Sequence, residues 1–110
     1  MAWVVVCRSE ALQEGGKGVR FRLGDDLEAF VVRYLSQVRA FRNHCPHRGL
    51  ELDWQERHFF DEKGTALVCA VHGARYDPAS GACLKGPCRG SALESMVCKE
   101  CAGLVVVKGT

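Results

Sequence analysis

Apolar and polar residues alternate over much of this chain with the period of two that is typical of β-strands. Val19–Leu23 is the clearest case, since two arginines separate its three apolar side chains, as in a half-buried strand. Other runs are rich in β-branched or aromatic residues and also predict strands. These runs are Trp3–Cys7, Leu27–Tyr34, Val38–Asn43, Ala66–Val68, Met96–Cys98 and Leu104–Lys108. No segment has the long 3.6-residue period of an amphipathic helix, so we expect an all-β fold.

Glycine-rich or polar residues separate the predicted strands and predict turns. Gly15–Gly18 and Gly24–Asp26 interrupt the chain on either side of Val19–Leu23, and Leu35–Gln37 joins two apolar runs into a predicted hairpin. Many short strands joined by such turns favour a small antiparallel sandwich or barrel. A chain of 110 residues can bury one modest core, so we expect residues 1–110 to form one domain.

Composition and charge narrow the range of functions. The formal net charge of +2 gives no sign of a nucleic-acid-binding surface. The opening run Met1–Cys7 is too short for a membrane span or a signal-peptide core, and it has no basic leader. Seven cysteines would suggest disulfides in a secreted protein, but an odd number without a signal favours reduced thiols and metal ligands. We therefore expect a cytoplasmic protein that binds neither nucleic acid nor a membrane.

Two short segments carry the candidate chemistry of the chain. Cys45 is followed two residues later by His47, and Cys69 is followed three residues later by His72. A pair of iron atoms bridged by sulfides needs four protein ligands, and two Cys with two His can hold it asymmetrically, Cys on one iron and His on the other. Because such a [2Fe-2S] cluster transfers one electron, these residues predict electron transfer.

Two other interpretations of these residues remain open. The first is coincidence, although Gly49 and Gly73 follow the two pairs and suit tight ligand-bearing loops. The second is a structural zinc site, which also uses two Cys and two His. Common zinc modules group like ligands together, whereas each pair here is mixed. The spacing therefore favours iron and sulfide over zinc.

On these residues the sequence resembles the Rieske [2Fe-2S] proteins, whose pattern is C-x-H followed by C-x-x-H. Residues 43–50 and 69–77 resemble the two cluster-binding loops, 81–87 resembles the proline loop that covers the cluster, and 103–107 resembles the final hairpin strand. The resemblance implies a Rieske-like antiparallel sandwich with a cluster-binding subdomain of two loops. It also implies that one [2Fe-2S] cluster is bound per chain. The expected ligands are Cys45 and Cys69 on the buried iron and His47 and His72 on the outer iron.

The sequence departs from the family pattern in two places. The interval between His47 and Cys69 is a few residues longer than usual, and the extra length falls in residues 55–64, which end in a predicted turn at 61–64. The respiratory members also carry a cysteine pair that bridges the loops, but Leu50 and Ala70-Val71 stand at those positions. The chain therefore resembles the soluble ferredoxin or oxygenase branch. Ala74 replaces a serine that donates a hydrogen bond to the cluster in high-potential members, whereas Tyr76 is kept.

The resemblance implies a one-electron carrier, such as the ferredoxin component of an oxygenase or a related redox system. The alternative is the small electron-transfer subunit of a larger reductase such as nitrite reductase. The chain is not expected to be an enzyme itself, since oxygenase chemistry needs a further iron on two His and a carboxylate, and only His44 and His58 are left over.

The expected partners are a reductase, an oxygenase or both, docking near His47 and His72. Four basic residues lie in or beside the predicted loops, and they would form a basic docking face if they surround the histidines. Ordinary solvated charge is the alternative. These residues are Arg48, Arg75, Lys85 and Arg89.

The remaining cysteines are not assigned to the cluster. Cys7 lies in an apolar run and is expected to be a small buried hydrophobic residue. Cys98 and Cys101 form a CxxC near a predicted hairpin tip, where an exposed, non-catalytic pair is expected. Cys83 and Cys88 flank a short loop across which they could meet, but in a reducing compartment we expect free thiols.

Overall fold

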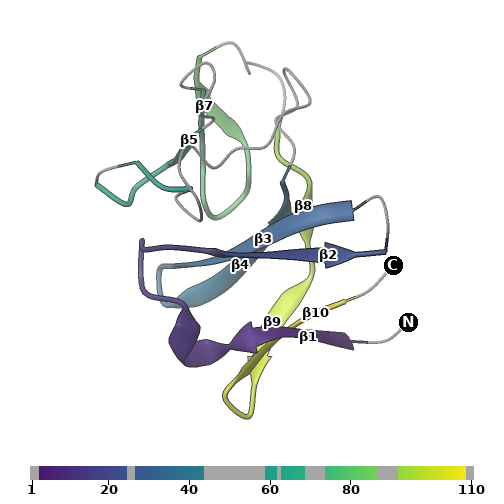
Figure 1. The fold of residues 1–110 in the computed structure, drawn as a ribbon. Helices are drawn as coiled ribbons and strands as arrows, with labels where there is room; N and C mark the ends of the chain where they lie inside the picture. The colour runs from purple at the N-terminus through teal and green to yellow at the C-terminus, as the bar shows by residue number, and fades with distance from the viewer. Residues whose placement is uncertain are drawn as a thin grey trace.

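The computed structural model describes residues 3–24, 27–43, 59–61, 63–68, 74–86 and 92–108. These residues form ten β-strands and one 3₁₀ helix (Figure 1). The elements are β1 (Trp3–Arg8), η1 (Ser9–Ala11), β2 (Val19–Leu23), β3 (Leu27–Tyr34), β4 (Gln37–Arg42), β5 (Leu67–Val68), β6 (Arg75–Tyr76), β7 (Cys83–Lys85), β8 (Ser95–Met96), β9 (Cys98–Cys101) and β10 (Leu104–Lys108). No helix in the described part of the chain has the length and apolar character needed to cross a bilayer.

The strands form three sheets, and all neighbouring strands within them are antiparallel. Their orders are β1-β10-β9, β2-β3-β4-β8 and β5-β6-β7. In Figure 1 the first two sheets lie one above the other, and the small third sheet stands at the far side of the second. The predicted all-β antiparallel architecture is confirmed.

Strand β3 is central because it is buried on both faces. Val31 faces the first sheet, whereas Phe30 and Val32 face the small third sheet. The first core cluster contains Leu12, Val31, Val38, Ala40, Val105 and Val107. The second contains Phe30, Val32, Phe41, Phe59, Phe60, Leu67, Ala74, Tyr76 and Leu93. A strand that is covered on both sides needs apolar residues at successive positions, which explains the continuous apolar run in this part of the sequence.

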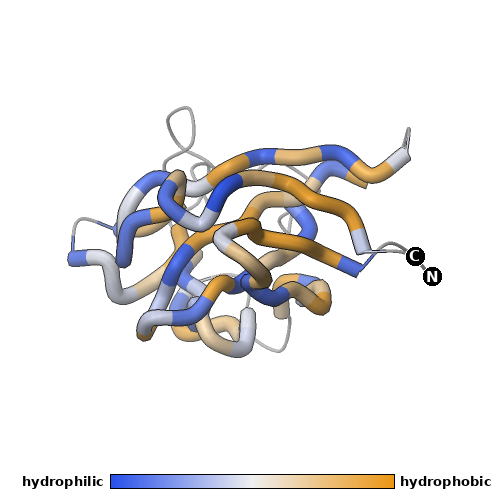
Figure 2. Tube along the Cα trace, turned by 90° about the horizontal axis from the view of Figure 1, so that it is seen from below, coloured by the Kyte–Doolittle hydropathy of each residue, from blue (hydrophilic) through white to orange (hydrophobic). Residues whose placement is uncertain are grey.

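Aromatic rings join the third sheet to the second. The rings of Phe30 and Phe59 stack with centroids 4.0 Å apart, and the Phe41 ring lies 5.9 Å from Phe30. The Gly18 backbone lies close to these rings, since a Cβ at Gly18 would lie 2.8 Å from the Phe59 ring. Figure 2 shows apolar stretches along the strands, with polar residues interspersed and at the turns. The third sheet is thus packed on β3 and β4 through large buried aromatic rings.

The predicted hairpin of β3 and β4 is present, with a tight turn at Leu35 and Ser36. Both residues have positive φ, 54° and 63°, which is unusual for residues other than glycine. The Glu14 carboxylate accepts hydrogen bonds from both backbone N–H groups, at 2.6 and 2.8 Å. Two charge-assisted hydrogen bonds therefore stabilise a turn that the residue types alone disfavour.

The end of the chain differs from the sequence-based prediction. A single strand was expected over Met96–Cys98, but the chain passes from one sheet to another at Val97. Strand β8 pairs with β4 on one side of this residue, and β9 pairs with β10 on the other. A sheet change within one apolar run leaves no periodicity signal, because both strands favour the same residue types.

An ion pair fastens the first sheet to the second. The Arg33 guanidinium donates to both carboxylate oxygens of Glu100, at 2.9 and 2.8 Å, and also to the carbonyls of Ser9 and Leu12, both at 3.0 Å. The hydrogen bonds from Arg33 lower the pKa of Glu100 to about 2. The paired charge thus holds β3, β9 and the 3₁₀ segment together.

Candidate metal centre

The four predicted ligands, Cys45, His47, Cys69 and His72, lie outside the described residues. The residues that lead into and out of their segments are described, and they fix where each segment begins or ends. Among the described residues, no group of three or more His, Cys, Asp or Glu side chains is placed to hold a metal ion. The position of a metal centre can therefore be inferred only from the strands that flank the predicted loops.

The second predicted loop is the connection of a β-hairpin. Strands β5 and β6 are antiparallel, with Val68 opposite Arg75 and Leu67 opposite Tyr76. Residues 69–73, which contain Cys69 and His72 in the sequence, therefore start and finish at one pair of neighbouring positions. Cys69 and His72 are three positions apart in this five-residue segment, so we expect both at one end of the hairpin.

The first predicted loop leaves from the end of β4. Its last described residue is Asn43, which is buried and donates its backbone N–H to the Glu28 carbonyl at 2.8 Å. Phe41, two residues earlier, belongs to the same core cluster as Ala74 and Tyr76 of the hairpin. One core thus supports both the exit to the first loop and the base of the second.

A third segment closes on the base of the second loop. Strand β7 pairs with β6 and is followed by Gly86, which has a φ of +100°. A Cβ on Gly86 would lie 3.0 Å from the Cα of Ala74, closer than ordinary van der Waals contact. Glycine at 86 and a small residue at 74 therefore let the two backbones meet, which suits the resemblance of residues 81–87 to a covering loop.

The turn that was predicted near the end of the longer interval before Cys69 is present in the structure. Asp61 begins it, and the Gly64 N–H donates to the Asp61 carbonyl at 3.0 Å. The Asp61 carboxylate accepts hydrogen bonds from the N–H groups of Thr65 and Ala66, from the Thr65 hydroxyl and from the Arg75 guanidinium at 2.9 Å. Burial tends to raise the pKa of Asp61, but these donors outweigh it and hold the pKa below its ordinary value.

The structural role of Asp61 was not identified from the sequence. An Asp followed four residues later by Thr is a weak turn signal, and the partner Arg75 is remote in sequence. The ion pair also changes the interpretation of Arg75, whose charge is locally balanced by Asp61. Of the other three basic residues, Lys85 is exposed on β7, and Arg48 and Arg89 lie outside the described residues.

Ala74 and Tyr76, the two residues considered for hydrogen bonding to a cluster, are both completely buried. The alanine offers no donor, whereas a buried tyrosine hydroxyl normally has a hydrogen-bond partner. Tyr76 follows the second loop directly and packs in the core at its base. This placement agrees with the role that the resemblance gives to the tyrosine.

The expectation of a free thiol at Cys83 is wrong, because Cys83 is disulfide-bonded. Its partner lies outside the described residues, since Cys7, Cys98 and Cys101 form no disulfide. The prediction for Cys83 and Cys88 relied on the redox state of the compartment alone. In the folded chain the distance between sulfur atoms also decides which thiols pair.

Cys98 and Cys101 do not form a redox pair. Both lie on β9, and residues three apart on a strand point to opposite faces. The Cys98 thiol donates to the Val38 carbonyl at 3.4 Å, and burial raises its pKa. The predicted non-catalytic role agrees with this geometry, although only Cys101 is exposed and Cys98 is half-buried.

Cys7 is half-buried against the first core cluster, as an apolar residue would be.

The donor set and its supports fit an iron–sulfur cluster. Two thiolates and two imidazoles are the ligands of an asymmetric [2Fe-2S] centre. The close contact of Gly86 with Ala74 and the buried Tyr76 provide a tight, largely apolar base for the loop that carries half of these ligands.

Comparison with known proteins gives the same result. The family model described as "Rieske [2Fe-2S] domain" matches residues 2–102. A search of curated proteins returned no significant match.

Several solved structures share the fold. The ferredoxin of carbazole 1,9a-dioxygenase from Nocardioides aromaticivorans IC177 is 24% identical over 100% of both chains, with a TM-score of 0.82. The ferredoxin of Sphingomonas yanoikuyae B1 is 20% identical over 99% of this chain and 100% of its own, with a TM-score of 0.81. A chain in a complex of reduced oxygenase and oxidised ferredoxin of carbazole 1,9a-dioxygenase is 24% identical over 97% of this chain and 93% of its own, with a TM-score of 0.82.

The family model spans both predicted ligand segments, and the structural likeness extends over nearly the whole chain. Together with the hairpin at residues 69–73 and the covering segment at Gly86, these matches show that the chain belongs to the Rieske [2Fe-2S] domain family.

Proposed function

We propose that this chain is a one-electron carrier, a ferredoxin component of an oxygenase or a related redox system, with residues 1–110 acting as one Rieske-type domain. Cys45 and Cys69 bind the buried iron, and His47 and His72 bind the outer iron. The observation that carries the proposal is the family match over residues 2–102, which includes all four residues. When bound, the cluster accepts and releases one electron with little change in its ligands.

The residues of the chain itself position this centre. Strands β5 and β6 flank residues 69–73, which contain Cys69 and His72 in the sequence, and this pairing supports a position for both ligands at one end of the hairpin. Gly86 lets β7 approach the start of β6, and the Asp61–Arg75 pair ties the preceding turn to the same strand. The histidine side is the natural route for the electron, because the outer iron lies nearer to the surface in this family.

The partner is proposed to be an oxygenase that accepts the electron and a reductase that supplies it. Support comes from the similar chains, which belong to ferredoxins of an aromatic dioxygenase and to a complex with its oxygenase. Docking near His47 and His72 would place the partner close to the outer iron. A cytoplasmic location is part of this proposal and can be tested by cell fractionation.

An anaerobic reductive titration tests the carrier function. Holoprotein should take up one electron per chain, reversibly, and pass it to an oxygenase without itself converting a substrate. His47→Ala and His72→Ala should abolish this reversible uptake, whereas His58→Ala, a histidine outside the motif, should leave it intact. No reversible electron uptake by the wild-type protein would refute the carrier function, and equal effects of all three variants would refute the ligand assignment.

A further inference from the structure

The disulfide at Cys83 lies at the start of the segment that resembles the covering loop. Cys83 is the first residue of β7, is half-buried, packs against the second core cluster and lies opposite Tyr76 of β6. Its sulfur is disulfide-bonded, to a cysteine outside the described residues. Three positions later, Gly86 meets Ala74 at the base of the second ligand loop. The bond is therefore made where the chain begins to cover that loop.

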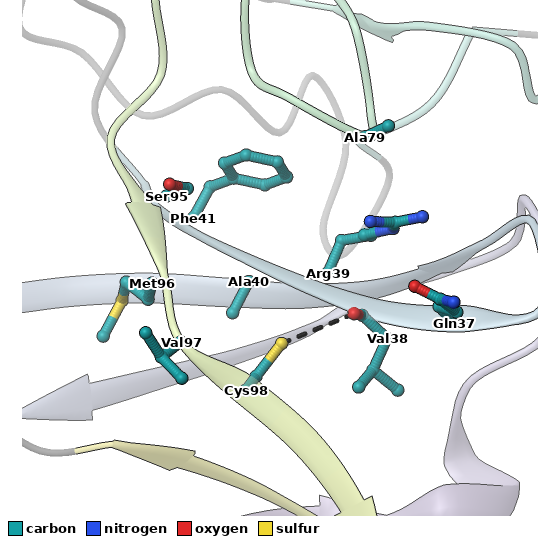
Figure 3. A pocket seen from close by; sticks show the side chains of 10 residues that line it. All are labelled: Gln37, Val38, Arg39, Ala40, Phe41, Ala79, Ser95, Met96, Val97 and Cys98. Atoms are coloured by element: carbon teal, nitrogen blue, oxygen red, sulfur yellow. Dashed lines mark hydrogen bonds between the residues drawn. The ribbon is translucent and has the colours of Figure 1, made fainter.

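The other cysteines narrow the choice of partner. Cys7, Cys98 and Cys101 form no disulfide. Figure 3 shows that the Cys98 thiol is hydrogen-bonded to the Val38 carbonyl instead. The cysteines that remain are Cys45, Cys69 and Cys88.

The pairing of the third sheet disfavours Cys69. Val68, the residue before it, lies opposite Arg75 on one side of β6, and Lys85 lies opposite Arg75 on the other side. Two strand spacings, about 9–10 Å, therefore separate Val68 from β7, and Cys83 is two residues further along that strand. Disulfides join residues whose Cα atoms lie within about 7 Å of each other. A cysteine directly after Val68 starts beyond that reach.

The described residues restrict the position of Cys88 far more tightly. Ala82 and Ala92 form an antiparallel bridge, so residues 83–91 start and finish at one pair of neighbouring positions. Cys88 falls inside this nine-residue connection, five positions after Cys83. Cys45 has no such connection to Cys83, and as a ligand its thiolate would be occupied by iron. The geometry thus favours Cys88 as the partner.

We propose that Cys83 and Cys88 form a reversible disulfide that closes residues 84–87 into a small ring and thereby holds Gly86 against Ala74. Leu84 and Lys85 are exposed, so a small thiol reagent can approach the ring. In a reducing compartment, a disulfide within a protein usually has a redox-sensing role. The bond would therefore make the fit of the covering segment depend on the thiol redox state of the cell.

The exchange is a two-electron reaction with a dithiol. The S–S bond between Cys83 and Cys88 breaks, each sulfur gains one electron and one proton, and the dithiol is oxidised to its own disulfide. This chemistry is separate from the one-electron reaction of the cluster. The proposal rests on the proposed function only in leaving Cys45 and Cys69 to the iron.

Peptide mapping of the holoprotein after anaerobic equilibration tests the bond. One sample is equilibrated with oxidised glutathione and another with dithiothreitol, and free thiols are alkylated before digestion. Because trypsin cleaves after Lys85, we expect two joined peptides, linked through Cys83 and Cys88, in the first sample and two separate alkylated peptides in the second. Cys88→Ser should remove the crosslink, whereas Cys101→Ser should retain it.

Release of iron to a chelator measures the consequence for the cluster. In oxidised glutathione, Cys88→Ser should lose its iron about 5- to 30-fold faster than Cys101→Ser, because the covering segment is no longer closed into a ring. Cys101→Ser should match the wild-type protein. Prior reduction with dithiothreitol should bring the wild-type rate close to that of Cys88→Ser.

The outcomes separate this proposal from the carrier function. Cluster-loaded protein without the crosslink would overturn the disulfide and leave the carrier function intact. The crosslink in protein that never binds a cluster would support the disulfide and refute the carrier function. A crosslink from Cys83 to Cys45 or Cys69, or equal iron release from Cys88→Ser and Cys101→Ser, would also overturn the proposal.

Discussion

At the scale of single residues, Gly86 and Ala74 set how closely the covering segment approaches the second ligand loop. Gly86 has a φ of +100°, and a Cβ at this position would lie 3.0 Å from the Ala74 Cα. The Ala74 backbone cannot move away easily, because Ala74 is completely buried. The space between the two backbones at this contact therefore depends on the small residues at positions 74 and 86.

Gly86→Ala should destabilise the holoprotein by roughly 2–3 kcal/mol, because backbone strain adds to a steric overlap. Gly103→Ala is the matched control, since Gly103 has a φ of +78° but nothing within 4 Å of its Cβ position. It should cost about 1 kcal/mol, from strain alone. Thermal unfolding followed by the visible spectrum measures both, and equal losses would show that the contact with Ala74 is unimportant.

Tyr76→Phe should lower the reduction potential of the cluster. A hydrogen bond to a ligand sulfur favours the reduced state, and one worth roughly 1 kcal/mol corresponds to about 40 mV. With Ala74 at the serine position, the wild-type potential should lie in the lower half of the roughly −150 to +300 mV Rieske range. Tyr34→Phe, which alters a tyrosine stacked on Phe60, should leave the potential unchanged in voltammetry. A higher potential in Tyr76→Phe would contradict this role.

The ligand residues are the part of the site that single-residue reasoning could predict. A Cys and a His at fixed short spacing are visible in the sequence, because metal ligation requires those side chains together. The support from Asp61 was not visible, since it depends on Arg75, which lies fourteen positions away on β6.

At the scale of elements, long strands were predictable and short ones were not. Val19–Leu23 and Leu27–Tyr34 were expected from their pattern and have those bounds in the structure. Strands β6 and β7 span two and three residues, too few for any periodicity to appear. Their pairing depends on the core formed with Phe30, Phe41 and Phe59, which no local pattern reveals.

The turn at Asp61 provides a test of how one element supports another. Asp61→Asn should destabilise the holoprotein by about 1–3 kcal/mol, because the charged acceptor of Thr65, Ala66 and Arg75 is lost. Glu28→Gln is the control, since Glu28 pairs with Arg20 and Arg22 at the surface, where such pairs contribute about 0–1 kcal/mol. Similar losses in both variants would contradict a special role for Asp61.

Acid should remove the contribution of Asp61. Because its folded-state pKa lies below the unfolded value near 3.8, the added stability is fully present above that value and is lost as the pH falls through the folded pKa. The stability difference between the wild-type protein and Asp61→Asn should therefore shrink in strong acid. A difference that stays constant over this range would show that the carboxylate charge is not involved.

At the scale of the whole molecule, the third sheet and the first sheet lie at opposite ends (Figure 1). The end with the third sheet is called the cluster-binding end below, because β5 and β6 flank the predicted ligand segment 69–73. Strand β7, which carries Lys85, belongs to the former end, and β9, which carries Lys99, belongs to the latter. If the partner docks at the cluster-binding end, charges there should influence the encounter more than charges on the first sheet.

Lys85→Glu should slow electron transfer to an acidic partner and weaken the dependence of the rate on salt, because electrostatic steering is reduced. Lys99→Glu makes the same charge change at the other end and should have little effect. Stopped-flow measurements at several ionic strengths compare the two variants. If Lys99→Glu slows transfer as much as Lys85→Glu, the docking surface lies elsewhere.

The most direct test of the central claim is the content and signal of the metal centre in anaerobically purified protein. We expect two irons and two acid-labile sulfides per chain, with a paramagnetic [2Fe-2S] signal that develops on one-electron reduction. Cys45→Ser and Cys69→Ser should each abolish that signal, whereas Cys101→Ser should retain it. One zinc per chain without labile sulfide, or an unchanged signal in Cys45→Ser, would contradict a Rieske-type [2Fe-2S] cluster held by these residues.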